Sequence, residues 1–253
     1  MKAEKFIEGS VVAQRRWTER LITLTVEAEP LAFEAGQFVK LALPAEGGGG
    51  EMVARAYSIA SPPGGRQYEF YYVVVPDGPL TPRLARLAAG DPVWLSPRPT
   101  GFLVLSEVPD AENLWLLATG TGVAPFLSIL RAETAWKRYQ RIVLVEAVRH
   151  AEELAYRDAI AQFGRDHPGR FASVVFVSRE QPPAGALPGR IPPAILDGKL
   201  EAAAGTALTA ASSQVMICGN PDMVKDTVQA LAERGMKKHR RRSPGQITVE
   251  NYW

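Results

Sequence analysis

The chain has 253 residues, of which 46% are hydrophobic and 22% are charged, and its formal net charge is +2. These values are typical of a globular protein and exclude a disordered or fibrous chain, and the weak net charge gives no support to nucleic-acid binding. No apolar run approaches the roughly 20 residues of a membrane helix. The single cysteine, Cys218, excludes an internal disulfide and an iron–sulfur cluster held by four cysteines. We therefore expect a cytoplasmic protein that binds neither nucleic acid nor membrane, with a monomer as the default assembly.

The first part of the chain, up to about residue 105, contains six short apolar segments separated by turn residues. The predicted strands are Ser10–Gln14, Leu21–Glu27, Gln37–Leu43, Val53–Ala60, Tyr68–Val75 and Pro92–Ser96. Six strands at this spacing predict an antiparallel β-barrel or sandwich. One helix is predicted among them, capped by Thr81, with Pro82 in its first turn, and ending at Ala89 before Gly90.

From about residue 112 the pattern changes to continuous apolar strands that alternate with helices. The predicted strands are Leu114–Ala118, Arg141–Val148, Phe171–Ser178 and Gln214–Cys218, and helices are predicted after the first strand, over 151–163 and over 221–233. This alternation predicts a parallel sheet covered by helices on both faces. The fold class is therefore a two-domain one, with a β-barrel domain over 1–108 and an α/β domain over 109–253.

A glycine-rich turn joins the first strand of the α/β part to a helix. Gly120 and Gly122 let the backbone approach a bound group, and Pro125 suits the first turn of the helix, whose N–H groups could face a pyrophosphate. The spacing G-x-G-x-x-P departs from the usual G-x-G-x-x-G. A purely structural glycine turn therefore stays open as the alternative.

This pattern lacks the acidic residue that usually hydrogen-bonds the ribose of the nucleotide, since Glu146 on the next strand is followed by Arg149. Two further arginines, Arg179 and Arg190, follow later apolar segments. Arginines at such positions favour the 2′-phosphate of NADP over the bare hydroxyl of NAD. The alternative interpretation is three surface arginines at loop ends.

Arg55-Ala56-Tyr57-Ser58 ends the fourth predicted strand. An arginine can pair with a pyrophosphate, a tyrosine can lie against a flat ring, and a serine hydroxyl can bond a ring nitrogen. A strand also uses Tyr and Ser for packing alone, but two companion motifs follow, Tyr71-Tyr72-Val73-Val74 and Gly78-Pro79-Leu80-Thr81.

Five motifs in this order resemble the ferredoxin–NADP reductase family, and most of all its bacterial ferredoxin (flavodoxin)–NADP reductases. They are R-x-Y-S at Arg55, G-x-L-T at Gly78, G-T-G-x-A-P at Gly120, Cys218-Gly219-Asn220-Pro221, and the terminal Val249-Glu250-Asn251-Tyr252-Trp253. The resemblance covers essentially the whole chain. It implies a barrel that binds FAD, an α/β domain that binds NADP(H), and a C-terminal tail that returns to the flavin.

The resemblance also implies the residues of each site. The FAD contacts would be Arg55, Ala56, Tyr57, Ser58, Tyr71, Tyr72, Val73, Val74, Pro79, Leu80, Thr81, Thr121, Tyr252 and Trp253. The NADP contacts would be Gly120, Gly122, Arg149, Arg179 and Arg190. In plant-type relatives the aromatic cover of the flavin is the final residue, whereas here Trp253 follows Tyr252.

Hydride transfer between nicotinamide and flavin, followed by single-electron steps with ferredoxin or flavodoxin, is the activity that the family implies. Its candidate catalytic residues are Ser58, Cys218, Glu250 and Tyr252. Two of these candidates have an alternative interpretation without a catalytic role. Cys218 could be a small buried hydrophobe, and Glu250 could be a solvated terminal acid. His150, His167 and His239 lack ligand spacing, so no metal is expected.

The basic run Lys237–Arg242 has two interpretations. It is either a solvated charged segment or a surface that docks an acidic partner or steers an anionic cofactor. Two rival functions also stay open. The first is a reductase component of an oxygenase, or a free-flavin reductase, on the same two-domain plan. The second is a flavin-binding module without catalytic activity.

Overall fold

The structure is a computed structural model that describes residues 6–46 and 50–251. The chain folds into two compact units. The first comprises the described residues up to Val104 together with Ala124–Ala132, and the second comprises Leu105–Val123 and the described residues from Glu133 onward. Helix α2 (Ala124–Arg131) therefore belongs to the first unit, although the strand before it belongs to the second.

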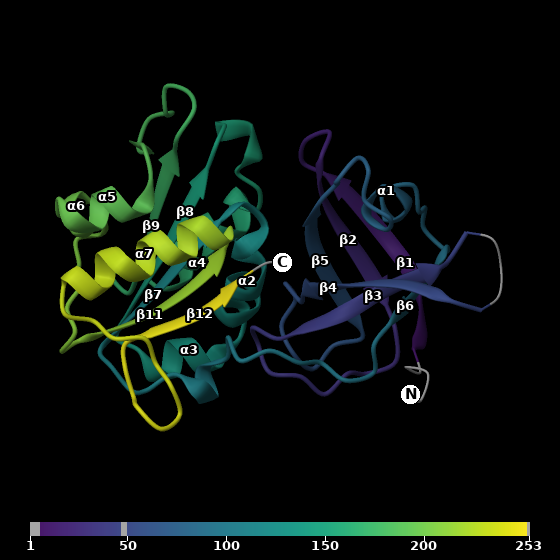
Figure 1. The fold of residues 1–253 in the computed structure, drawn as a ribbon, viewed down its shortest axis with the longest axis horizontal. Coiled ribbons are helices and arrows are strands. Elements are labelled where there is room, and N and C mark those ends of the chain that lie inside the picture. Colours follow the sequence, from purple (N-terminus) through teal and green to yellow (C-terminus); the bar gives the residue numbers. More distant parts are fainter. Residues whose placement is uncertain (1–5, 47–49, 252–253) are drawn as a thin grey trace. The chain divides into compact units, whose positions relative to one another are not determined.

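The first unit is built on a six-stranded antiparallel sheet with the order β4-β3-β6-β1-β2-β5 (Figure 1). Its strands are β1 (Ile7–Arg16), β2 (Leu21–Glu27), β3 (Phe38–Pro44), β4 (Met52–Ser58), β5 (Gln67–Val73) and β6 (Pro92–Leu95). An antiparallel bridge between Ile59 and Phe70 joins the segment after β4 to β5, so the two edge strands meet and the sheet closes. The predicted antiparallel barrel is confirmed.

Helix α1 (Thr81–Leu84) is shorter than the sequence predicts. Its N-cap is Leu80, which makes no side-chain cap, so the predicted cap at Thr81 is wrong. The Thr81 hydroxyl instead accepts from the Val75 N–H at 2.9 Å and closes the turn before the helix. After Leu84 the chain tightens, since the Arg86 and Leu87 N–H groups donate to carbonyls three residues back, and the Ala88 N–H donates to the Asp91 carboxylate at 2.7 Å.

The second unit is built on a parallel sheet with the order β10-β9-β8-β7-β11-β12. Its strands are β7 (Asn113–Thr119), β8 (Arg141–Val148), β9 (Phe171–Val177), β10 (Leu187–Pro188), β11 (Ser213–Gly219) and β12 (Ile247–Asn251). Its helices are α3 (Glu133–Arg138), α4 (Arg157–Asp166), α5 (Ile191–Leu196), α6 (Lys199–Ala204) and α7 (Pro221–Glu233). The predicted parallel sheet is confirmed.

Several elements of this unit differ from the sequence-based expectation. The helix predicted over 151–163 begins only at Arg157, because Tyr156 adopts a left-handed backbone with φ of 56°. The prediction also lacks β10, β12, α3, α5 and α6. Strand β10 has two residues, and β12 alternates polar and apolar side chains, so neither forms the continuous apolar run typical of a buried strand.

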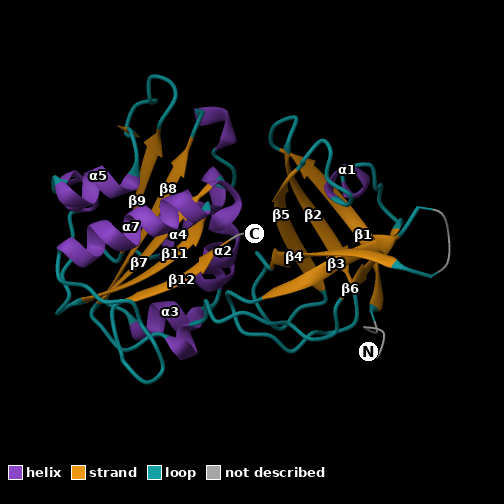
Figure 2. Ribbon diagram, viewed as in Figure 1, coloured by secondary structure: helices purple, strands orange, loops and turns teal. Residues whose placement is uncertain are grey.

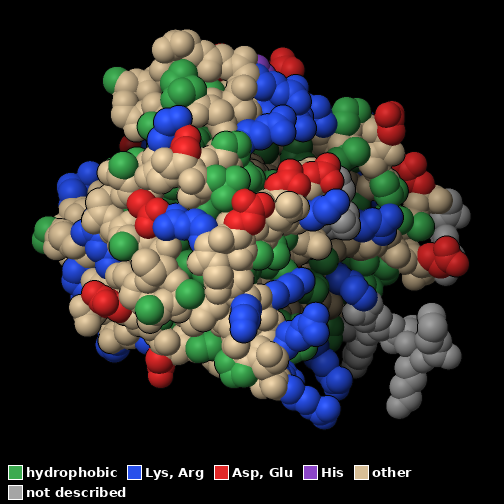
Figure 3. Space-filling view, turned by 60° about the vertical axis from the view of Figure 1, so that its left-hand side comes forward, with side chains coloured by type: hydrophobic (Ala, Val, Ile, Leu, Met, Phe, Trp, Pro, Cys, Tyr) green, Lys and Arg blue, Asp and Glu red, His purple; other side chains and the backbone are tan. Residues whose placement is uncertain are grey.

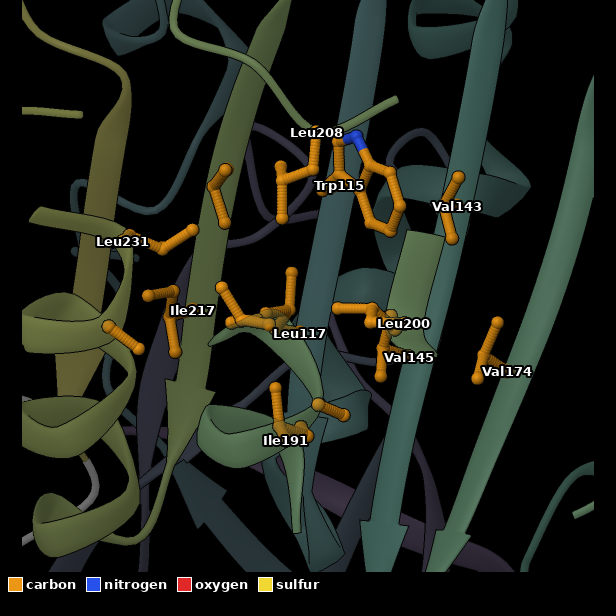
Figure 4. Close-up of a cluster of buried hydrophobic side chains, with 14 of the residues drawn as sticks. Trp115, Leu117, Val143, Val145, Val174, Ile191, Leu200, Leu208, Ile217 and Leu231 are labelled. Carbon is orange, nitrogen blue, oxygen red and sulfur yellow. The ribbon is translucent and has the colours of Figure 1, made fainter. Parts of the chain in front are cut away.

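Helices α5 and α7 lie across one face of the parallel strands (Figure 2), and together with α6 they enclose the core of this unit. Trp115, Leu117 and Val145 from the sheet are buried there with Ile191 and Leu231 from the helices (Figure 4). On the opposite face, aromatic side chains of α3 and α4 contact the first residue of β9. Both faces are covered, which explains why the central strands are apolar throughout.

None of the helices among residues 6–46 and 50–251 combines the length and the apolar character that a membrane crossing requires.

Leu117→Ala tests how much this core contributes to the free energy of unfolding. Leu117 is fully buried, so we expect the variant to lower the free energy of unfolding by about 2–5 kcal/mol. Leu196→Ala is the matched control, because Leu196 is 53% exposed and should change stability by less than about 0.5 kcal/mol. Urea unfolding followed by circular dichroism measures both. Equal losses in the two variants would contradict the assignment of this core.

Candidate active site

The parallel sheet has a switch point, which is the place where the order of successive strands across the sheet reverses. From β7 the chain continues to β8 on one side, and it returns later to β11 on the other side of β7. Ligands of open α/β sheets bind at the carboxyl ends of the strands beside such a point. The candidate site is therefore where β7 ends at Thr119 and β11 ends at Gly219.

Two glycines lock these strand ends together. A Cβ at Gly122 would collide with the carbonyl of Cys218, and a Cβ at Gly219 would collide with the hydroxyl of Thr119. That hydroxyl accepts a hydrogen bond from the Asn220 N–H at 3.1 Å. The sequence predicts that both glycines of the turn open space for a bound group. Instead Gly122 packs on the chain's own strand, and only Gly120, with φ of 52°, has open space beside its Cα.

The residues after each strand end start a helix. After β7, a 3₁₀ turn over Gly120–Val123 contains half-buried Thr121 and leads into α2, where Pro125 is the second residue, as predicted for its first turn. After β11, the Asn220 side chain accepts from the N–H groups of Asp222 and Met223 at 3.0 and 3.3 Å and caps α7. Two helix starts, each with a positive dipole end, thus follow the strands that meet at this point.

Cys218 and Glu250 are partners across β11 and β12. Cys218 is fully buried, as its packing interpretation requires. Glu250 is half-buried, and its Oε2 is enclosed without a hydrogen-bond partner among the described residues. Burial raises the pKa of Glu250 to about 7. The interpretation of Glu250 as a solvated terminal acid is therefore wrong, and this carboxyl can exchange a proton near neutral pH.

A second buried acid lies in the same row of the sheet. The register runs from Glu146 on β8 through Ala118 on β7 to Cys218 and then to Glu250, so the four residues share one level of the sheet. Glu146 is 7% exposed, and burial raises its pKa to about 8 against the opposing effect of Arg157. From the sequence, Glu146 is considered only as a residue that could hydrogen-bond the ribose, because its burial on a strand face is not evident from its neighbours in the chain.

Three predicted phosphate-binding arginines follow neighbouring strands. Arg149 follows β8, Arg179 follows β9, and Arg190 follows β10, so the backbone places all three at the carboxyl edge of the sheet. The Arg179 N–H donates to the Arg149 carbonyl at 3.0 Å, and the Gly189 N–H donates to the Val177 carbonyl at 3.0 Å. All three arginines are exposed, and no described acid pairs with their guanidinium groups. The edge thus carries positive charge that an anionic ligand can neutralise.

The motif Arg55–Ser58 forms the end of β4 in the first unit. Arg55 is exposed and donates to the Ala54 carbonyl at 2.7 Å, whereas Ser58 is 4% exposed. The Tyr57 ring meets the Tyr72 ring of β5 edge to face, with centroids 5.8 Å apart. Burial raises the pKa of both tyrosines, so their hydroxyls stay neutral donors.

The remaining predicted flavin residues of this unit surround the same strand end. Tyr71 is buried, Val73 and Val74 are half-buried at the end of β5, and Leu80 is buried before α1. Ala56 and Pro79 are exposed. The structure thus brings β4, the end of β5 and the start of α1 together within one unit.

Sequence reasoning missed Arg16 at the end of β1. Its register leads through Ile22 of β2 to Tyr72 of β5, and its guanidinium donates to the Ala85 carbonyl at 2.7 Å. Its charge opposes the rise in the pKa of Tyr72. The neighbouring Arg15 stacks on Trp17 instead, with its guanidinium carbon 3.7 Å from the ring centroid. In the sequence, only the alternation of side chains between the two faces of a strand distinguishes these two adjacent arginines.

Five enclosed polar atoms have no hydrogen-bond partner among the described residues, and the second unit holds four of them, on Trp115, Tyr139, Thr248 and Glu250. The Tyr72 hydroxyl of the first unit and the Glu250 Oε2 of the second have no hydrogen-bond partner among the described residues. Buried polar groups are nearly always satisfied in folded proteins, by the protein, water or a ligand. Tyr72 and Glu250 are the two of these five residues that are predicted as site residues, and an unpartnered polar atom at each can accept a partner group from a bound cofactor.

The basic run lies at the other end of the parallel sheet. Lys237–Arg242 precedes β12, so it lies at the amino edge, opposite the edge that carries the three arginines. Arg241 pairs with Glu107 through two hydrogen bonds, at 2.9 and 2.5 Å, whereas Arg240 and Arg242 are exposed and pair with no described acid. Lys and Arg side chains gather in patches on the face shown in Figure 3. The position of this run gives no support to a role in gripping the nucleotide.

Comparison with known proteins agrees with this geometry. Residues 116–229 match the family described as the oxidoreductase NAD-binding domain. Flavodoxin/ferredoxin–NADP reductases of Shigella flexneri and Escherichia coli are 47% and 46% identical to the chain over 249 residues, which cover 98% of this chain and 99% of each relative. A crystal structure of a ferredoxin NADP+ reductase from Neisseria gonorrhoeae with bound FAD and NADP has a TM-score of 0.92 and 37% identity, covering 98% of this chain and 99% of that one.

The chain belongs to the flavodoxin/ferredoxin–NADP reductase family.

Membership of the flavodoxin/ferredoxin–NADP reductase family confirms the predicted resemblance, the two-domain fold class and the assignment as an oxidoreductase. The predicted site residues Tyr252 and Trp253 lie outside the described residues. The other predicted residues fall into two groups, one at the β4 end of the barrel and one at the carboxyl edge of the parallel sheet.

Glu146→Gln tests the buried acid of the reductase. The unfolded carboxyl loses its proton above its ordinary pKa of 4.5, whereas the folded one keeps it up to about 8. The folded state therefore binds more protons in this range, and the free energy of unfolding falls by on the order of 1 kcal/mol per pH unit. In the variant this contribution is absent, so its fall should be smaller, and the raised pKa of Glu250 accounts for a remaining part below pH 7. Urea unfolding from pH 5 to pH 8 measures it.

The matched control is Glu152→Gln, which changes an exposed acid of the same unit. It should reproduce the pH profile of the unaltered protein. Parallel profiles for Glu146→Gln and the unaltered protein would contradict the assignment of a protonated buried acid.

Proposed function

We propose that the enzyme moves a hydride between NADP(H) and a bound FAD, and single electrons between that flavin and a ferredoxin or flavodoxin. The observation that carries the proposal is the full-length similarity to flavodoxin/ferredoxin–NADP reductases, together with a carboxyl edge of the parallel sheet that bears three arginines without acidic partners among the described residues. FAD and NADP(H) are the cofactors. The flavin supplies the change from two-electron to one-electron chemistry, and the chain binds, orients and protects it.

FAD binding is assigned to the barrel region, residues 1–108, with the C-terminal tail. Its contacts are Arg55, Ala56, Tyr57, Ser58, Tyr71, Tyr72, Val73, Val74, Pro79, Leu80, Thr81, Thr121, Tyr252 and Trp253. The exposed Arg55 offers charge for the pyrophosphate, and the enclosed Tyr72 hydroxyl offers a neutral donor. The fit of these groups to a large anionic cofactor supports the assignment.

NADP(H) binding is assigned to the α/β region, residues 109–253. Gly120 and Gly122 shape the turn, and Arg149, Arg179 and Arg190 hold the 2′-phosphate. Three exposed guanidinium groups at one sheet edge offer several charge-assisted hydrogen bonds to a phosphate. A bare ribose hydroxyl would leave this charge without a partner, so we infer a preference for NADP(H) over NAD(H).

Ser58, Cys218, Glu250 and Tyr252 are assigned to the reaction centre. Glu250 holds or releases a proton near neutral pH, because burial raises its pKa to about 7. Cys218 is its cross-strand partner and fills the space beside it without exposing a charge. Ser58, buried at the end of β4, offers a hydroxyl to the flavin.

The partner is a ferredoxin, a flavodoxin or both, and the enzyme is assigned as a cytoplasmic monomer. The absence of a nucleic-acid partner is inferred from the net charge of +2. The basic run Lys237–Arg242 is exposed except for His239, which suits a surface that attracts an acidic redox protein.

An anaerobic titration tests the function. NADPH should bleach the flavin absorbance of the purified protein rapidly, and NADH should bleach it poorly. Arg179→Gln should lower kcat/KM for NADPH about tenfold or more and leave kcat/KM for NADH unchanged, because only NADPH loses a charged hydrogen bond. Arg165→Gln, an exposed arginine of α4 away from this edge, is the matched control.

Equal bleaching by both nucleotides would contradict the arginine assignment and favour an oxygenase reductase component or a free-flavin reductase. Bound FAD that NADPH does not bleach would favour a non-catalytic flavin module. A protein that cannot hold FAD would overturn the proposal.

Charge reversal tests the role of the basic run. The double variant Arg240→Glu and Arg242→Glu should slow reduction of ferredoxin or flavodoxin at low salt and flatten its dependence on ionic strength. The rate at which NADPH reduces a small neutral dye through the enzyme should stay unchanged. The Arg241–Glu107 pair is left intact, so the loop keeps its anchor. An unaltered salt dependence would show that the run is only a solvated segment.

A further inference from the structure

Helix α2 is bound to the barrel directly beside the flavin motif. The Ser128 hydroxyl donates to the Ser61 carbonyl at 2.7 Å, and the Arg131 guanidinium donates to the Ala60 carbonyl at 2.9 Å. Arg131 also pairs with Glu69 of β5 at 2.9 Å. All of these residues belong to the first unit.

The carbonyls that α2 holds are two and three residues beyond Ser58. Ala60 is fully buried and Ser61 is 6% exposed, so water does not readily replace a lost donor at either carbonyl. The N–H groups of the same segment are held by other elements, since Ile59 donates to the Gln37 carbonyl at 3.0 Å and Ala60 donates to the Glu69 carbonyl at 2.8 Å. The segment after Ser58 is therefore fixed on its N–H side by Gln37 and by Glu69 of β5, and on its carbonyl side by α2.

Helix α2 is also the direct continuation of the glycine turn. Gly120–Val123 ends where Ala124 begins the helix, and Ser128 lies about one turn further along it. The same short helix thus begins at the turn assigned to NADP(H) and ends on the segment that directly follows the strand assigned to FAD. This continuity is covalent and does not depend on any contact between the two units.

We infer that Ser128 and Arg131 are positioning residues for Ser58. The two residues hold the end of β4 in the geometry that hydride transfer requires, and they link it to the turn at Gly120–Val123. The inference rests on the proposed function, because it takes the motif at Ser58 as the flavin site. Neither residue is assigned a contact with FAD or NADP(H). Both act through the backbone of Ala60 and Ser61.

The inference separates two kinds of kinetic effect. A misplaced reacting group lowers the rate of the chemical step, whereas a lost ligand contact weakens binding. Arg131→Gln and Ser128→Ala should therefore slow flavin reduction at saturating NADPH by about tenfold to a hundredfold. The KM for NADPH and the FAD content should stay within about twofold of the unaltered enzyme.

Stopped-flow reduction of the FAD-loaded enzyme by NADPH is the measurement, with rates expressed per bound flavin. Arg131→Lys, which keeps the charge opposite Glu69, should recover part of the lost rate. The flavin absorbance change on adding NADP+ should be smaller in Arg131→Gln than in the unaltered enzyme, because the link to the turn is weakened. Arg66→Gln is the matched control, since Arg66 pairs with Glu29 on the surface of the same unit and should leave all values unchanged.

Unchanged rates per flavin in both variants would overturn the inference. Loss of FAD with a normal rate per remaining flavin would also overturn it, because it would show a role in holding the cofactor only. If Arg131→Gln does not fold, Ser128→Ala decides, since it removes one hydroxyl and keeps the ion pair. Failure of the proposed function is recognised separately, because NADPH would then not reduce the unaltered enzyme.

Discussion

The unit built on the parallel sheet depends on two close contacts that glycines make where β7 and β11 end. Gly122 lies against the carbonyl of Cys218, and Gly219 lies against the hydroxyl of Thr119. Side chains at either glycine would force β7 and β11 apart at their carboxyl ends. Because the switch point is held by shape and not by a side-chain pair, the turn, Cys218 and its partner Glu250 keep a common edge without any charged anchor.

That arrangement separates the charges of the α/β unit into two zones. Inside, the acids Glu146 and Glu250 share a row of the sheet, and burial raises the pKa of both toward or above neutrality. At the rim, Arg149, Arg179 and Arg190 are exposed and have no described acidic partner. The positive charge of this part of the unit is therefore concentrated at the exposed rim, where it can attract an anionic group.

The sequence predicts the elements whose signal is local. Apolar runs define β7, β8, β9 and β11, and glycine spacing indicates the turn at Gly120. The residues it misses depend on which strands become neighbours. Glu146 is buried because β8 is a central strand of a sheet whose two faces are covered, and Arg16 reaches the level of Tyr72 only through the register across β2. The short α1 has a local cause instead, since the Ala88 N–H donates to the carboxylate of the nearby Asp91.

The grouping of α2 with the barrel has a consequence for how this protein can be divided. The chain leaves the first unit after Val104, re-enters it for Ala124–Ala132 and leaves it again. No single cut of the polypeptide therefore yields both units intact. A barrel severed near residue 108 would lose the donors that α2 supplies to the carbonyls of Ala60 and Ser61. Recombination between reductases of this kind must exchange the barrel as two separate segments of the gene, or graft a matching α2 onto the recipient.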